Sequence, residues 1–193
     1  MKMMRFILLG VFVLMAAAVG LVGYNWYRGS SGEAYGGPFV LVDQKGAEIT
    51  EQAFRGHPTV VFFGFTHCPE VCPTTLAEMD SWLSTLGEQG REIRAYFVSI
   101  DPERDDAATM DRYVGNVSQR ITGITGEPDK IAEMAKAFGI FAKKVPLDGG
   151  DYTMDHTATV LLLDRNGGFF GTIAYGENAD TAVAKLKRLV NEG

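Results

Sequence analysis

The 193-residue chain has few side chains suited to metal or thiol chemistry and no excess of positive charge. It contains 2 cysteines and 3 histidines, and its formal net charge is −6. A negative charge disfavours nucleic acid as a partner, because surfaces that bind it are usually basic. The sequence also lacks a glycine-rich phosphate-binding loop and a repeat of fixed period. What remains is a globular chain, 46% hydrophobic, long enough for one domain with one core.

The longest uncharged run lies near the N-terminus, at residues 6–23, and it predicts a single transmembrane helix. A helix needs roughly 20 apolar residues to cross the hydrocarbon core of a bilayer. Aromatic side chains follow at residues 24–27, as is common where a helix leaves the membrane. Lys2 and Arg5 precede the run, so the positive-inside tendency places the N-terminus in the cytoplasm and the rest of the chain across the membrane.

A cleaved signal peptide is the alternative for this segment, because residues 16–18 are small alanines. The apolar run continues beyond them, which favours an anchor. We therefore expect a membrane anchor at residues 1–27, a flexible spacer rich in small residues at 28–37 and a folded domain at 38–193. The protein would be a single-pass inner-membrane protein with its soluble domain in the periplasm or an equivalent intermembrane space.

The order of predicted elements indicates an α/β fold. Strands are predicted at residues 39–42, 59–65, 94–100, 157–163 and 169–174, and helices at residues 73–88, 103–114, 128–138 and 179–191. Residues 59–65 form a continuous apolar run, typical of a buried parallel strand, and the last two strands indicate a hairpin. Strand and helix alternate before that hairpin and a closing helix. This order predicts a thioredoxin-like fold with a mixed central sheet flanked by helices.

Cys68 and Cys72 lie together in CPEVC, at the junction of a predicted strand and helix. The start of a helix stabilises a thiolate, which both metal binding and redox chemistry require. A structural disulfide is disfavoured, because a bridge across so short a loop removes little chain entropy, and peroxidase activity is disfavoured because the motif lacks the expected peroxidatic pattern. Thioredoxin-like oxidoreductases usually place two residues between their cysteines, whereas three leave more room for an ion. Metal binding and redox exchange both stay open.

His156 is the best candidate for a third metal ligand. His57 is expected to be a solvated turn residue, and His67 adjoins Cys68, where neighbouring strand residues point to opposite sides. His156 precedes a predicted strand, in the loop where thioredoxins carry a cis-proline against the cysteine pair. Ala158 stands near that place instead. Two thiolates select Cu(I), and an additional imidazole also suits Cu(II), while zinc usually requires a fourth ligand.

Three motifs occur in a fixed order: GFTHCPEVCPTTLAEM at residues 64–79, IDPERD at 100–105 and DYTMDHT at 151–157. Together they closely resemble the Sco/SenC family, over roughly residues 37–190. The resemblance implies a membrane-anchored, thioredoxin-fold copper protein that helps to build the binuclear copper site of cytochrome c oxidase.

The resemblance places the copper ligands on Cys68, Cys72 and His156. We therefore expect a metallochaperone that binds one copper ion, as Cu(I), Cu(II) or both. Its expected partners are the copper-binding subunit of cytochrome c oxidase, a copper donor chaperone and a thioredoxin-like reductant. The family is also linked to thiol-disulfide exchange. The alternative is thus an enzyme, a thiol-disulfide oxidoreductase that uses Cys68 and Cys72 to reduce the oxidase's copper-binding cysteines.

Other residues of these motifs have local explanations. Asp101 and Asp105 fit the family pattern but are expected to begin a helix rather than contact metal. Asp155 is expected either to orient His156 or to be exposed at the surface. His57 stands where the family more often has lysine, a harmless departure.

Overall fold

The computed structural model describes residues 15, 19–21 and 34–193. Residues 15 and 19–21 are helical. Among all described residues, no helix has both the length and the apolar character needed to cross a membrane. Most of the span predicted at residues 6–23 lies outside the described residues, as does most of the spacer predicted at 28–37.

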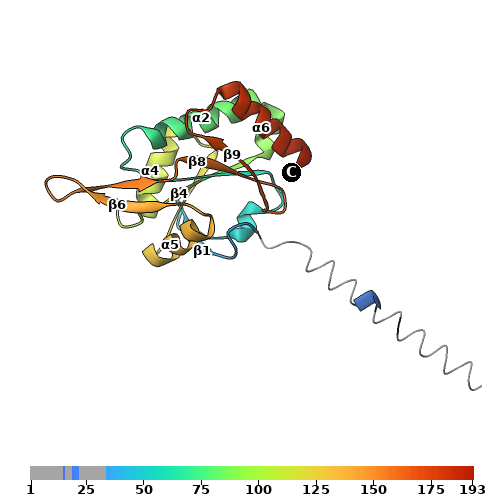
Figure 1. Cartoon of the computed structure of the whole chain (residues 1–193), viewed down its shortest axis with the longest axis horizontal. Helices are drawn as coiled ribbons and strands as arrows, with labels where there is room; N and C mark the ends of the chain where they lie inside the picture. The colour runs from blue at the N-terminus through green and yellow to red at the C-terminus, as the bar shows by residue number, and fades with distance from the viewer. Residues whose placement is uncertain (1–14, 16–18, 22–33) are drawn as a thin grey trace, which may run out of the picture. The chain divides into compact units, whose positions relative to one another are not determined.

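A seven-stranded mixed sheet forms the centre of the domain, with strand order β2-β1-β5-β4-β3-β8-β9 (Figure 1). The strands are β1 (Val40–Asp43), β2 (Glu48–Thr50), β3 (Thr59–Gly64), β4 (Arg94–Ser99), β5 (Ile121–Thr125), β8 (Thr159–Leu163) and β9 (Phe169–Ala174). β3, β4 and β5 run parallel to one another, whereas β8 pairs antiparallel with β3, and β9 with β8. The predicted thioredoxin-like fold with a mixed central sheet is confirmed.

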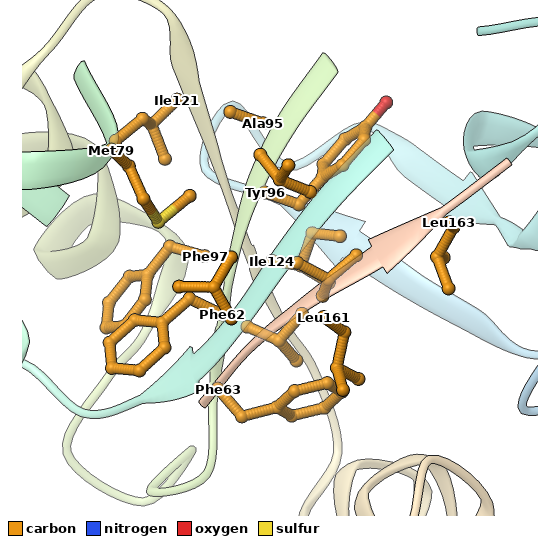
Figure 2. Close-up of a cluster of buried hydrophobic side chains, with 14 of the residues drawn as sticks. Phe62, Phe63, Met79, Ala95, Tyr96, Phe97, Ile121, Ile124, Leu161 and Leu163 are labelled. Atoms are coloured by element: carbon orange, nitrogen blue, oxygen red, sulfur yellow. The ribbon is translucent and has the colours of Figure 1, made fainter. Parts of the chain in front are cut away.

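Helices cover both faces of this sheet. They are η1 (Glu51–Phe54, a 3-10 helix), α2 (Val71–Thr85), α3 (Glu88–Glu92), α4 (Ala107–Val117), α5 (Pro128–Ala137) and α6 (Ala179–Glu192). In Figure 1, α2 and α6 lie on one side of the sheet and α5 on the other. Phe62 and Phe63 alternate along β3: Phe62 stacks on Phe97 at 6.0 Å (Figure 2), and Phe63 packs against Phe138 at 5.4 Å. Burial on both faces explains the continuous apolar run of β3.

The starts of two helices differ from prediction. α2 begins at Val71, so Pro73 is its third residue rather than its first. α4 begins at Ala107 and is capped by Asp106, whose side chain accepts a hydrogen bond from the Thr109 amide at 2.7 Å. The prediction that Asp101 and Asp105 begin this helix is therefore wrong. Their carboxylates accept hydrogen bonds from other segments of the domain instead.

Several elements were not predicted, among them β2, β5, α3 and a second, two-stranded sheet. This sheet pairs β6 (Ala142–Pro146) with β7 (Tyr152–His156), and in Figure 1 the hairpin extends away from the main sheet. β6 is exposed along its whole length, so its sequence shows no alternation of buried and exposed residues. His156 is consequently the last residue of a strand, not part of a loop.

Residues 34–37, assigned above to the spacer, pack against the domain. The Tyr35 amide donates to the Gly167 carbonyl at 2.8 Å. The Tyr35 ring contacts Phe138 at 5.4 Å and Phe169 at 5.2 Å between centroids. Tyr35 is thus attached to the folded domain, because its ring buries apolar area against these two aromatic rings.

Candidate metal centre

Cys68 and Cys72 lie where the chain leaves β3 and enters α2. Cys68 is partly exposed and Cys72 is buried, and both are free thiols. The Cys72 amide donates to Cys68 Sγ at 3.3 Å. This amide belongs to the first turn of α2, where backbone N–H groups lack partners within the helix and the helix dipole favours negative charge. The local backbone therefore stabilises a thiolate at Cys68.

Gly64, the last residue of β3, makes room for the second sulfur. A Cβ placed on Gly64 would lie 2.7 Å from Cys72 Sγ and 2.7 Å from Cε2 of Phe97. Real Cβ atoms do not approach other heavy atoms so closely. Cys72 Sγ thus packs directly on the backbone of β3, and only glycine fits at this position without displacing it.

The two cysteines differ in their acidity. Hydrogen bonding from the Cys72 side chain, aided by the backbone N–H groups of the first turn, lowers the pKa of Cys68 to about 5. The same side-chain hydrogen bond, together with burial, raises the pKa of Cys72 well above its ordinary value. At neutral pH Cys68 is therefore the thiolate and Cys72 keeps its proton.

β7 brings His156 to the buried sulfur. His156 Nε2 lies 3.7 Å from Cys72 Sγ, and Nδ1 lies 3.0 Å from the Thr157 carbonyl oxygen. A carbonyl oxygen only accepts hydrogen bonds, so Nδ1 carries a proton, and in the neutral imidazole Nε2 keeps its lone pair. Phe62 and Phe65 pack against the ring, at 6.2 and 5.8 Å between centroids. The imidazole is therefore held with its free lone pair directed toward Cys72, as metal ligation requires.

The structure brings the three predicted site residues together in pairs. Cys72 contacts Cys68 through its amide and His156 through its sulfur. Among the described residues, however, no group of three or more His, Cys, Asp or Glu side chains lies close enough together to hold a metal ion. To bind one ion together, both sulfurs and Nε2 would have to move closer to one another than they lie in this structure.

Asp105 fixes the loop that leads to Cys68. Its carboxylate is buried and accepts hydrogen bonds from the Thr66 amide at 3.0 Å, from the Thr66 hydroxyl, and from the Ser99 hydroxyl at 2.7 Å. These bonds join the start of the cysteine loop to the end of β4. No sequence pattern indicates this role, because an aspartate before a helix is locally explained as a cap.

The other candidate residues point elsewhere. The exposed ring of His67 contacts the Thr66 hydroxyl at 3.1 Å and lies 3.8 Å from Asp105. His57 precedes β3, at the opposite end of that strand from the cysteines. Asp155 is exposed on β7, where it pairs in register with Lys143. Of the two roles predicted for Asp155, the structure shows surface exposure.

The fold and the site define a thioredoxin-like protein with a cysteine pair and a histidine gathered at one end of the sheet. Residues 28–191 match the family model described as SCO1/SenC. The chain therefore belongs to the SCO1/SenC family, which confirms the resemblance carried by the three sequence motifs.

Relatives of known structure match most of the chain. The copper-bound structure of Bradyrhizobium japonicum ScoI is 42% identical with a TM-score of 0.74, and the match covers 82% of this chain and 99% of that one. Copper-bound yeast Sco1 is 31% identical with a TM-score of 0.76, and the match covers 83% and 90% of the two chains. The mitochondrial SCO2 homologue of Danio rerio is 34% identical over 155 residues, 79% of this chain and 55% of that protein. The chain spans about half the length of its mitochondrial relatives.

The pKa of Cys68 predicts how its alkylation depends on pH. Only the thiolate reacts with iodoacetamide, so the rate should be half-maximal near the pKa of about 5 and fall below it, while buried Cys72 reacts little. Peptide mass spectrometry over a pH series measures the rate at each cysteine. In Cys72→Ala the midpoint should move up toward the ordinary value of 9.0, because the main hydrogen bond to the thiolate is lost. A midpoint near 9 in the unsubstituted protein would contradict the lowered pKa.

Gly64→Ala tests the close packing of Cys72 on β3. The added methyl group overlaps Cys72 Sγ and the Phe97 ring, so stability should fall by about 1–3 kcal/mol and the alkylation midpoint of Cys68 should rise. Gly171→Ala is the matched control, because a Cβ at this strand glycine meets its nearest atom only at 4.0 Å. Urea unfolding and alkylation measure both effects. Equal behaviour of the two variants would show that Gly64 does not determine where the sulfur lies.

Proposed function

We propose that this protein is a copper metallochaperone that binds one copper ion through Cys68, Cys72 and His156. The observation that carries the proposal is the 3.7 Å approach of His156 Nε2 to Cys72 Sγ, beside the Cys68 thiolate. Two sulfurs suit Cu(I), and an added imidazole also suits Cu(II). The copper-bound relatives from Bradyrhizobium japonicum and yeast support this assignment, because they match over most of the chain.

The donor groups fit copper as cargo. Cys68 offers a thiolate at neutral pH, and Cys72 releases its proton as the positive ion stabilises the second thiolate. The hydrogen bond from His156 Nδ1 to Thr157 keeps the imidazole in the tautomer that binds metal. Cys72 is buried, whereas Cys68 and His156 are partly exposed. A partner's ligands therefore approach from the side of Cys68 and His156, where they replace these ligands one at a time.

The proposed recipient is the copper-binding subunit of cytochrome c oxidase, as membership of the family implies. Residues 6–23 are the proposed single-pass anchor, which keeps the domain on the periplasmic or intermembrane-space side. The mitochondrial designation of relatives such as yeast Sco1 supports this placement. Further proposed partners are a copper donor chaperone and a thioredoxin-like reductant that keeps both cysteines reduced.

A thiol-disulfide oxidoreductase is the second candidate function, and the unequal cysteines favour it. The partly exposed Cys68 thiolate attacks a substrate disulfide and forms a mixed disulfide, releasing one substrate thiolate. Cys72 loses its proton and attacks Cys68 Sγ, so that the second substrate sulfur leaves as a thiol. The substrate gains two electrons while Cys68 and Cys72 become a disulfide. His156 separates the candidates, because dithiol exchange does not require the imidazole.

Copper titration of the purified protein tests the ligand set. The reduced protein should bind one Cu(II) or Cu(I) per chain, and oxidation to the Cys68–Cys72 disulfide should abolish binding reversibly. His156→Ala should weaken Cu(II) binding by more than about 100-fold and Cu(I) binding less, because two thiolates alone still hold Cu(I). His57→Ala, at the far end of β3, should change neither affinity. Unchanged Cu(II) affinity in His156→Ala would refute the ligand assignment.

Oxidase assembly in cells separates delivery of copper from reduction of thiols. Cells carrying His156→Ala should assemble oxidase without its binuclear copper, as should cells carrying Cys68→Ser. Copper content and activity of the isolated oxidase measure the outcome, with His57→Ala as the control. If His156→Ala cells assemble normal oxidase and Cys68→Ser cells do not, the protein acts as an oxidoreductase instead.

A further inference from the structure

The strand that carries His156 lies outside the main sheet. β6 and β7 form their own two-stranded sheet, in which His156 pairs in register with Ala142. A lone two-stranded hairpin is only marginally stable in water. The position of His156 therefore depends on how this hairpin is attached to the rest of the domain.

One cluster of side chains attaches the first residue of β7, at the opposite end of the strand from His156, to the rest of the domain. The Tyr152 hydroxyl donates to Asp101 Oδ1 at 2.7 Å, and Arg104 Nε donates to Asp101 Oδ2. Arg104 Nη1 donates to the Tyr152 carbonyl at 2.9 Å and to Asp151 at 3.2 Å. The guanidinium carbon also lies 3.8 Å from the centre of the Tyr152 ring. We name Asp101, Arg104 and Tyr152 the hairpin latch.

Burial makes these contacts strong. The side chain of Asp101 is fully buried and that of Arg104 is 17% exposed, so water screens their charges little. Hydrogen bonds to an ionised group are about twice as strong as neutral ones. The neighbouring ion pair of Lys144 with Glu103 is exposed, and such pairs add little. The hairpin latch is therefore the main polar attachment at this end of β7, among the residues that the structure describes.

The same loop also holds the cysteine side of the site. Asp101 and Arg104 belong to the segment between β4 and α4, and so does Asp105, whose carboxylate fixes Thr66 before Cys68. Within this loop the Asp105 amide donates to the Asp101 carbonyl at 3.0 Å. One short loop thus connects the segment that carries the cysteines with the strand that carries the histidine.

We propose that the hairpin latch positions His156 against Cys72 and thereby sets the affinity for Cu(II). This inference rests on the proposed function, in which His156 is a copper ligand. Tyr152 and His156 are the first and last residues of β7 and lie on the same face of the strand, directed toward the domain. Asp101, Arg104 and Tyr152 are positioning residues and do not touch the ion.

The latch acts through the fraction of molecules with a docked hairpin. For a ligand that requires the docked form, the apparent dissociation constant equals the intrinsic dissociation constant divided by that fraction. When the latch is weakened, Cu(II) affinity falls, whereas Cu(I) affinity changes less because the two sulfurs remain in place. The core and its stability are little affected, since β6 and β7 lie outside the main sheet.

A double-mutant cycle with copper ions tests the positioning role. Tyr152→Phe removes the hydroxyl and keeps the ring, and it should weaken Cu(II) binding about tenfold, the cost of a lost hydrogen bond to a charged group. In the His156→Ala background the same change should have no further effect. Tyr175→Phe, at an exposed tyrosine beyond β9, is the control. An equal loss in both backgrounds would overturn the positioning role.

Hydrogen exchange without added copper gives an independent readout. Amides of β7 should exchange about tenfold faster in Tyr152→Phe, and also in Arg104→Lys, while those of β3 and β4 stay unchanged. Unchanged exchange in β7 would overturn the inference. If His156→Ala weakens Cu(II) binding and Tyr152→Phe does not, the positioning role alone fails. If His156→Ala itself has no effect, the ligand assignment fails and the positioning role with it.

Discussion

The buried carboxylate of Asp105 is the contact on which the geometry of the site depends. It accepts hydrogen bonds from Thr66, before the cysteines, and from Ser99, at the end of β4. Its own backbone carbonyl accepts one from the Thr125 hydroxyl at 2.6 Å, at the end of β5. A buried carboxylate is costly unless such donors surround it. With them, the carboxylate joins the cysteine loop to the end of β4, while the Asp105 carbonyl adds the end of β5, so that the cysteine side of the site has a defined place.

Much of this arrangement could be predicted from local sequence signals. β3 was predictable because burial on both faces requires an unbroken apolar run, and the run of residues 59–65 nearly coincides with it. Cys68 and Cys72 were predictable as a pair because few residue types form thiolates and both stand at the start of a helix. His156 was predictable as the candidate third ligand because the chain has only three histidines and the other two have local explanations.

The rest depended on contacts between distant segments. Asp101, Asp105 and Asp106 stand close together before α4, and each satisfies the local preference for a cap. Asp101 and Asp105 bond to distant segments instead, so Asp106 is the residue that caps α4. The hairpin of β6 and β7 was equally hidden, because a strand exposed along its length carries no alternation of apolar residues. The role of Gly64 could not be predicted, because it depends on Cys72 Sγ, which packs against its backbone in the folded structure.

The proposed donor groups are divided between two kinds of structure. Cys72 belongs to the core, whereas His156 ends a hairpin whose outer strand is exposed throughout. Substitutions, insertions or deletions in that hairpin therefore change the position of His156, the proposed third ligand, without creating cavities in the core. If His156 is the third ligand, natural variation can adjust metal preference and core stability separately on this fold. The same division makes the hairpin a suitable segment to exchange when a cysteine-pair scaffold is redesigned for another soft metal.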